Sequence, residues 1–295
     1  MYFLGFNWNP DDTLLKLGFI QIKYYNMLWI AAFVLGWFIM KRIFLNEKKS
    51  MEKLDSLFIY TVVSIMLGAR LEALFGFFNG YEFTGFTGLA SHGATIAAII
   101  GVWLYCRKWK DIGILWLLDR LVVPSAIGAC FVRLGNFFNS EINGDKVESS
   151  FLFATRFIRD SEDMPAYKAM SLTNETNASA AYKAIATKPE FSSILEAIPY
   201  RHPAQLYEAF GYALLFVLLY FLYWKTDKKG KVGYLFGVFM VGLWTIRFFV
   251  EFVKKSQGGF GDIIKLLSTG QWLSIPMIGI GLYFMFRPTK TKTSV

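Results

Sequence analysis

Cysteine and histidine are scarce in this chain of 295 residues, which has two of each. Cys106 and Cys130 lie in neighbouring apolar runs, near opposite ends of the helices that we expect there. They are therefore too far apart for the short Cα separation of a disulfide. His92 and His202, without a cluster of cysteines, do not supply a zinc or di-iron ligand set. We expect neither a metal nor another cofactor.

The N-terminus lacks the basic region of a cleaved signal peptide, and only 18% of all residues are charged. Apolar residues are abundant instead: 55% of the chain is hydrophobic, 18% is aromatic, and the mean hydropathy is +0.39. A soluble globular protein rarely carries this composition. The net charge of +9 does not indicate nucleic-acid binding, because most Lys and Arg form short clusters between apolar runs.

Seven apolar runs are long enough to cross a membrane, where a helix needs about 20 residues. They cover residues 22–44, 57–78, 90–106, 112–138, 203–224, 232–253 and 271–286. Basic clusters follow the first, third, fifth and seventh runs, at 41–53, 107–110, 225–231 and 287–292. Cytoplasmic loops carry the excess of Lys and Arg. The sequence therefore predicts an all-α polytopic membrane protein with seven transmembrane helices, its N-terminus outside and its C-terminus inside.

The predicted topology divides the chain into five parts. These are an extracytoplasmic N-terminal arm at 1–21, spans one to four at 22–144, an extracytoplasmic head insert at 145–200, spans five to seven at 201–286, and a cytoplasmic tail at 287–295. The insert is too long for a plain connection, so we expect a small folded head. Alternation of Phe151, Phe153, Thr155 and Phe157 predicts a strand in it. Short helices and loops are expected from Pro165 to Ile198.

Charged and amide side chains within or beside the apolar runs are the main functional candidates, since a charge in hydrocarbon is costly. Nearly all of them lie toward the extracytoplasmic ends of five runs: Arg70, Glu72, His92, Arg133, Asn136, Asn139, Glu141, His202, Gln205, Glu208, Arg247 and Glu251. Asp119 is the exception, in the inner half of the fourth run. Polar groups gathered at one depth indicate a site near the extracytoplasmic face.

The densest part of this group has helical spacing. Arg133, Asn136 and Asn139 recur every three residues and should form one stripe on a helix. Gly135, between them, leaves room for a lipid headgroup to approach the backbone. Three polar groups on one stripe are hard to explain by a purely structural role.

Structural roles stay open for other members of the group. Arg247 and Glu251, four residues apart, could form an ion pair within the bundle, and His92 could cap the third helix. His202 precedes Pro203 at a predicted helix start. This position gives His202 a structural role that requires no part in catalysis.

Five segments of the chain carry most of these residues. They are Gly68-Ala69-Arg70-Leu71, Ser91-His92-Gly93-Ala94, RLGNFFNSE at 133–141 followed by Gly144, RHPAQLYE at 201–208, and Arg247-Phe248 to Glu251-Phe252 followed by GQWLSIP at 270–276. Together and in this order they resemble the signature of the bacterial prolipoprotein diacylglyceryl transferases. The match covers nearly all the predicted spans but not the head insert.

This resemblance implies that the chain moves the diacylglyceryl group of phosphatidylglycerol onto the lipobox cysteine thiol of a preprolipoprotein. The reaction would need no metal, would take place in the bacterial inner membrane, and would leave glycerol phosphate. The resemblance implies catalytic roles for His92, Arg133 and Arg247. It implies substrate binding by Tyr25, Arg70, Asn136, Asn139, Glu141, Gly144, Gln205, Glu208 and Glu251.

The reaction chemistry suggests separate roles for the three catalytic candidates. The leaving phosphate ester develops negative charge in a low-dielectric site, where Arg133 and Arg247 could clamp it with planar, permanently charged groups. The attacking thiol, with a free pKa of about 8.5, must lose its proton. His92 is either the base that takes this proton or a group that orients the headgroup.

Other functions predict other patterns. A transporter or flippase of an anionic lipid is the main alternative, but it should place its charges near the bilayer midplane, with symmetry between halves or interrupted helices. The sequence has no visible internal repeat. A metal-dependent phosphotransferase would need clustered carboxylates on a span, and a non-catalytic scaffold would leave the buried arginines unexplained.

Overall fold

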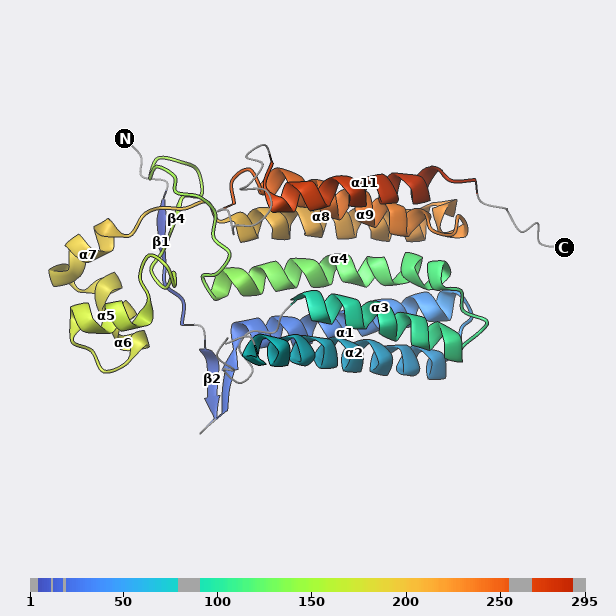
Figure 1. The fold of residues 1–295 in the computed structure, drawn as a ribbon, viewed down its shortest axis with the longest axis horizontal. Helices are drawn as coiled ribbons and strands as arrows, with labels where there is room; N and C mark the ends of the chain where they lie inside the picture. Colours follow the sequence, from blue (N-terminus) through green and yellow to red (C-terminus); the bar gives the residue numbers. More distant parts are fainter. Residues whose placement is uncertain (1–4, 12, 18–19, 79–90, 255–266, 289–295) are drawn as a thin grey trace.

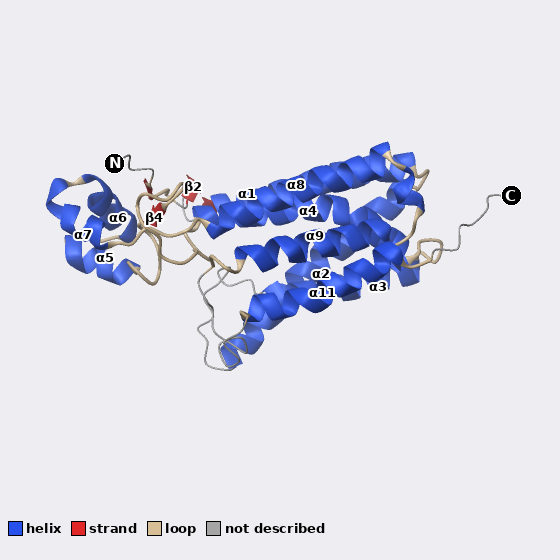
Figure 2. Cartoon of the chain, turned by 90° about the horizontal axis from the view of Figure 1, so that it is seen from above, coloured by secondary structure: helices blue, strands red, loops and turns tan. Residues whose placement is uncertain are grey.

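The computed structural model describes residues 5–11, 13–17, 20–78, 91–254 and 267–288. Long helices run side by side, and a smaller head lies at one end of them (Figure 1). The short strands also lie at the head end (Figure 2). The described chain is mostly helical, as the sequence predicts, with two small two-stranded sheets that belong to the N-terminal region and the head.

The long helices coincide with the seven predicted apolar runs. They are α1 (Tyr24–Asn46), α2 (Met51–Phe78), α3 (Ser91–Lys108), α4 (Ile114–Phe138), α8 (Ala204–Lys225), α9 (Tyr234–Val250) and α11 (Thr269–Phe286). Helix α9 ends before the predicted boundary at 253, because Lys254 forms an antiparallel bridge with Gly144 after a short turn. Helix α11 begins with a capping box, in which Ser268 and Gln271 exchange hydrogen bonds.

Small residues allow neighbouring helices to approach closely, as is common between membrane helices. A Cβ atom on Gly68 of α2 would overlap the carbonyl oxygen of Gly93 in α3. A Cβ atom on Gly237 of α9 would lie 2.6 Å from the carbonyl oxygen of Gly281 in α11. Helix α4 is central, in contact with α1 on one side and with α8 and α9 on the other.

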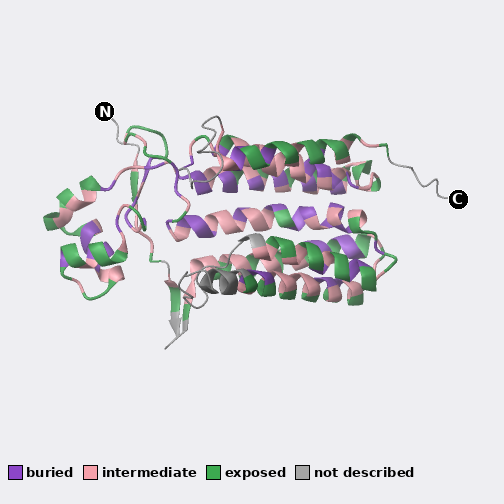
Figure 3. Cartoon of the chain, in the orientation of Figure 1, coloured by how far each residue is buried: buried purple, intermediate pink, exposed green. Residues whose placement is uncertain are grey.

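The surface of the bundle is apolar. Exposed and half-buried residues run along the whole length of the long helices (Figure 3). Helices α1, α2, α4 and α8 are long and apolar enough to cross a membrane, and α9 is a shorter apolar helix. Ile99, Phe210 and Phe249 are each at least 65% exposed. Exposed apolar surface on this scale indicates a membrane-embedded protein.

The end of the bundle opposite the head contains Asp119, the residue that falls outside the predicted extracytoplasmic group. Asp119 is fully buried and accepts hydrogen bonds from the backbone N atoms of Gly233 (2.5 Å) and Phe236 (2.9 Å). It therefore caps the start of α9, where a negative charge is favourable. The neighbouring Arg120 pairs with Glu47 at 2.8 Å. Asp119 has a structural explanation.

The head combines strands from two parts of the chain with short helices. It contains β4 (Thr155–Phe157), α5 (Ala166–Thr173), α6 (Ala178–Thr187), η1 (Pro189–Phe191) and α7 (Ser192–Ala197). Strand β4 pairs in parallel with β1 (Phe6–Trp8), while β2 (Thr13–Leu17) and β3 (Ile20–Lys23) form a separate antiparallel hairpin. The strand predicted from Phe151 starts only at Thr155. Phe153 has a φ of 70°, a left-handed conformation that interrupts a strand.

Candidate active site

Most of the predicted polar residues gather at the head end of α4, α8 and α9. The most direct contact joins α4 to α8, where Arg133 Nε lies 2.5 Å from Glu208 Oε2. The side chain of Glu208 is 1% exposed and that of Arg133 is 15% exposed. Neither carboxylate oxygen of Glu208 has a hydrogen bond of good geometry within the described part of the chain. The buried carboxylate oxygens of Glu208 can therefore accept further hydrogen bonds.

The predicted stripe on α4 converges on one carboxylate. Arg133 Nη1 donates to Asn136 Oδ1 at 3.1 Å, and Asn136 Nδ2 donates to Glu141 Oε1 at 2.7 Å. Asn139, which ends α4, donates to the same oxygen at 3.2 Å. These bonds orient the guanidinium of Arg133 from both sides, with Glu208 on one and Asn136 on the other.

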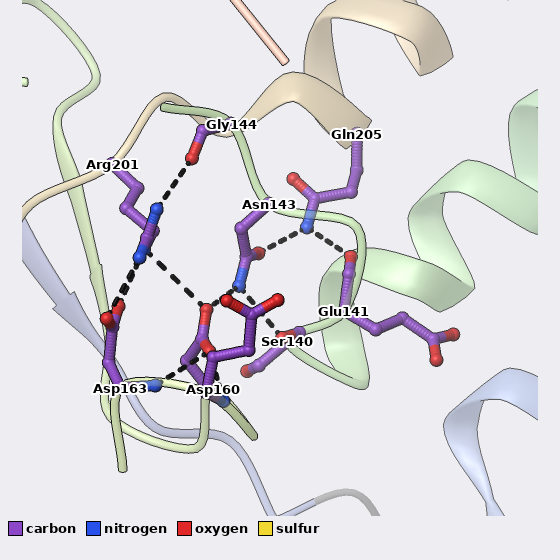
Figure 4. Close-up of polar contacts among 9 residues, drawn as sticks. Ser140, Glu141, Asn143, Gly144, Asp160, Asp163, Arg201 and Gln205 are labelled. Atoms are coloured by element: carbon purple, nitrogen blue, oxygen red, sulfur yellow. Dashed lines mark hydrogen bonds and ion pairs between the residues drawn. The ribbon is translucent and has the colours of Figure 1, made fainter. Parts of the chain in front are cut away.

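Gln205 holds the loop that follows α4 (Figure 4). Its side chain is fully buried, and Nε2 donates to the backbone oxygen of Glu141 and to Asn143 Oδ1, both at 2.6 Å. Sequence reasoning did not select Asn143, although it lies between Glu141 and Gly144 of the signature segment. Substrate binding by Gln205 stays a prediction.

Gly144 lies where three backbone segments meet. Its N atom donates to the carbonyl oxygen of His202 at 2.9 Å, and it faces Lys254 in the bridge that follows α9. A Cβ atom here would lie 2.5 Å from the carbonyl oxygen of Val253 and 2.7 Å from that of His202. This crowding requires glycine at the position.

Arg247 and Glu251 do not form an ion pair with each other among the described side chains. The guanidinium of Arg247 lies 5.7 Å from the ring centre of Trp244, and its Nε is buried without a hydrogen-bond partner in the described chain. The carboxylate of Glu251 lies at the start of α11, where a Cβ atom on Gly270 would come within 2.6 Å of both its oxygens. The positive end of α11 stabilises this carboxylate.

Lys254 is a buried cation that sequence reasoning missed. It is 6% exposed, and burial lowers its pKa; Glu208 and Glu251 oppose this change, while Arg133 and Arg247 add to it. Helical spacing does not relate it to Arg247 and Glu251, because α9 ends at Val250 and a turn precedes Lys254. Lys254 joins Arg133 and Arg247 as a third cation beside Glu208 and Glu251.

Tyr25 occupies the space that Gly135 provides. A Cβ atom on Gly135 would lie 2.6 Å from Tyr25 Cδ2, so the tyrosine ring of α1 packs directly on the backbone of α4. The close approach that we expected for a headgroup is therefore made by Tyr25. The phenol lies within electrostatic range of Glu141 and Arg133.

The first and second segments of the signature meet where α2 packs on α3. The contact between Gly68 and Gly93 brings the turn that carries Arg70 next to the start of α3. Arg70 is half-buried. The side chains of Glu72 and His92 lie outside the described residues, so the roles expected for His92 stay predictions.

His202 occupies a structural position. Its Nδ1 lies 3.3 Å from the hydroxyl of Tyr207, and its ring meets that of Phe151 edge to face at 4.6 Å. Burial lowers the pKa of His202, and the charge of Asp145 partly opposes this shift. Pro203 is the N-cap of α8, one residue before the first helical position.

Known proteins match this chain over almost its whole length. The sequence model of a family described as prolipoprotein diacylglyceryl transferase matches residues 12–287. The phosphatidylglycerol–prolipoprotein diacylglyceryl transferase of Bacteroides fragilis is 35% identical, with 98% of each chain covered. The proteins of the same name from Tolumonas auensis and Porphyromonas gingivalis are 33% and 34% identical, with 97% and 96% of this chain and 98% and 94% of theirs covered. The chain belongs to the prolipoprotein diacylglyceryl transferase family.

Proposed function

We propose that this chain transfers the diacylglyceryl group of phosphatidylglycerol to the lipobox cysteine of preprolipoproteins. The observation that carries this proposal is the partly buried group formed by Arg133, Arg247 and Lys254 with Glu208 and Glu251, at one end of a membrane-embedded bundle. A phosphodiester headgroup carries one negative charge, which these cations could bind. An anionic lipid would reach the site from the surrounding bilayer.

The chemistry needs a charge-stabilising site more than a nucleophile from the protein. The thiolate of the peptide attacks the glyceryl carbon, a carbon–sulfur bond forms, and the carbon–oxygen bond to the phosphate breaks. The electron pair leaves with glycerol phosphate, and the thiol proton passes to a base. Arg133 and Arg247 would stabilise the developing charge on the phosphate as oriented, permanently charged donors.

An apolar cavity supports a lipid substrate. A space of about 420 Å³ lies between α1, α2 and α4, lined by residues that include Trp29, Phe33 and Phe58. It is also lined by Val132, the residue before Arg133. A diacyl lipid whose phosphate contacts Arg133 could therefore place an acyl chain in this cavity.

The seven-span topology and its orientation belong to the same proposal. Contacts at the end away from the head join the basic loops to one another. Lys49 and Lys53 both reach Asp111, at 3.3 and 2.7 Å, and Arg287 donates to the carbonyl oxygen of Val232 at 2.8 Å. One basic end supports a cytoplasmic location for these loops. A head and a site at the extracytoplasmic face of the inner membrane belong to this proposal.

Mass spectrometry of a lipobox peptide incubated with purified protein and phosphatidylglycerol tests the activity. We expect a gain of one diacylglyceryl group, absent with a Cys→Ser peptide. Arg133→Lys and Arg247→Lys should each lower kcat about a hundredfold or more, since a point charge replaces a bidentate donor. Arg42→Lys, at the far end of the bundle, is the matched control. Folded wild-type protein that forms no adduct would instead favour a lipid transporter.

His92→Gln separates the two roles expected for His92. Glutamine can hydrogen-bond a headgroup but cannot accept the thiol proton as a base near neutral pH. Loss of turnover that recovers at high pH, where the peptide thiol ionises by itself, would support the base. Near-normal turnover with an unchanged pH profile would support the orienting role.

A further inference from the structure

Buried hydrogen bonds join the head to residues 140–144, which we call the site loop (Figure 4). Arg201 donates from Nε and Nη2 to the two carboxylate oxygens of Asp163, at 2.7 and 2.9 Å. Its Nη1 donates to the carbonyl oxygen of Gly144 at 3.2 Å. Arg201 is 3% exposed, so these charge-assisted bonds form where water competes little.

A second connection runs through Asn143. Its Nδ2 donates to Asp160 Oδ2 at 2.6 Å and to the carbonyl oxygen of Ser140 at 2.9 Å, while its Oδ1 accepts from Gln205 at 2.6 Å. The other oxygen of Asp160 accepts from the backbone N of Asp163 at 3.2 Å. The Asn143 amide is therefore bonded on both sides and cannot turn freely.

The site loop continues this connection to the reacting groups. Gln205 also holds the backbone oxygen of Glu141, and the Glu141 carboxylate accepts from Asn136. Asn136 in turn accepts from Arg133 at 3.1 Å. A shift of the loop would move Glu141 and thereby Asn136, which helps to orient the Arg133 guanidinium.

We propose that the head is a positioning element of the active site. Asp160 and Asp163 act through Asn143 and Arg201 to hold the site loop, and thereby the direction in which Arg133 presents its donors to the phosphate. Misplacement of a charge-stabilising group by about 1 Å can cost a hundredfold in rate. This inference rests on the proposed transferase function.

Exchange of donor and acceptor in one buried bond provides the test. Asn143→Asp removes the donor of this bond. Asp160→Asn leaves one acceptor oxygen for donors that now use two, Asn143 on one side and the backbone N atoms of Glu162 and Asp163 on the other. The double variant reverses the polarity of the bond. Each single variant should lower kcat about tenfold or more with little change in KM for phosphatidylglycerol, because the lost contact matters in the transition state. The double variant should recover part of this loss, because it restores the bond between residues 143 and 160 but not the bond to the carbonyl oxygen of Ser140. Tyr182→Phe is the matched control, since it removes a buried hydrogen bond of the head, to the carbonyl oxygen of Met164, away from the site loop.

Arg201→Lys is a second, milder variant in case the single variants fail to fold. It keeps a positive charge beside Asp163 but loses the bidentate contact. We expect its kcat to fall while its melting temperature stays close to that of Tyr182→Phe. A kcat equal to that of the control at equal stability would overturn the proposal, and so would a double variant without recovery.

Hydrogen exchange of the site loop provides a readout independent of activity. The amide of Gly144 bonds to His202 and should exchange faster in Asp160→Asn than in Tyr182→Phe. Unchanged exchange would overturn the positioning role. Absence of product from both wild type and Tyr182→Phe would instead refute the transferase function, and the exchange result would still decide whether the head holds the loop.

Discussion

The carboxylate of Glu208 lies 2.5 Å from the Nε atom of Arg133, so that the first turns of α8 contact the end of α4. The two residues come from different segments of the signature, 75 positions apart in the sequence numbering. Both charges lie largely out of water, where each depends on the other for compensation. The stability of the α4–α8 contact is thus linked to the charges of the site.

Glu208→Ala should therefore destabilise the protein as well as inactivate it. Removal of one member of a buried ion pair leaves the other charge uncompensated, and we expect a loss of about 3–5 kcal/mol. Glu208→Gln keeps the shape and should lose less. Thermal unfolding in detergent measures both changes, with the exposed Glu148→Ala as the control. Equal melting temperatures for Glu208→Ala and the control would contradict the buried pairing.

Lys254→Met should weaken binding of phosphatidylglycerol, because one of the three cations that could attract the phosphate is then lost. We expect KM for the lipid to rise about tenfold, as for loss of one charge-assisted contact, with Lys254→Arg close to wild type. Burial lowers the pKa of Lys254, so lipid binding should weaken with rising pH earlier than an ordinary lysine allows. Lys254→Arg should not show this alkaline loss, since arginine stays charged.

Lys231→Met is the matched control for Lys254→Met. Lys231 donates to the carbonyl oxygen of Met285 at 2.6 Å, at the opposite end of the bundle. Its replacement should leave KM for the lipid unchanged. A similar rise in KM for both variants would show that loss of any lysine weakens lipid binding. It would contradict a specific role of Lys254 in binding the lipid.

Gly144→Ala should disrupt the site loop. The new methyl group would meet two carbonyl oxygens at 2.5 and 2.7 Å, so the backbone must move and the bond from Gly144 to His202 is lost. We expect at least a tenfold loss of kcat, consistent with displacement of a positioned group. Gly113→Ala, with no atom within 4 Å of the added methyl group, should retain wild-type activity in the same assay.

Asp119→Ala should affect stability without affecting chemistry. The variant leaves the backbone N atoms of Gly233 and Phe236 without their acceptors, and we expect a loss of about 1–3 kcal/mol. The kcat of folded protein should stay at the wild-type value, because this cap lies at the end away from the site. Melting temperature and turnover measured on one preparation check both statements. A selective loss of kcat would give Asp119 a functional role that the structure does not suggest.

The contacts of the Arg133 stripe could be predicted, because they depend on helical spacing alone. Residues three apart on a helix are neighbours whatever surrounds them, and Arg133 does contact Asn136. The start of α8 at Ala204 and the short helices of the head could also be predicted, because they too depend on local sequence. The early end of α9 was not, since it follows from the bridge between Lys254 and Gly144.

The sequence by itself determined the membrane character of this protein, its long helices and the end of the bundle where polar groups gather, because apolar length and charge clustering are local properties of a chain. Only the tertiary structure decided that Asp163 holds Arg201 across 38 positions, that Asn143 meets Asp160, and that Lys254 is buried. These contacts join residues that no periodicity relates. They form only after the helices and the head have packed, when burial makes an unpaired charge or amide costly.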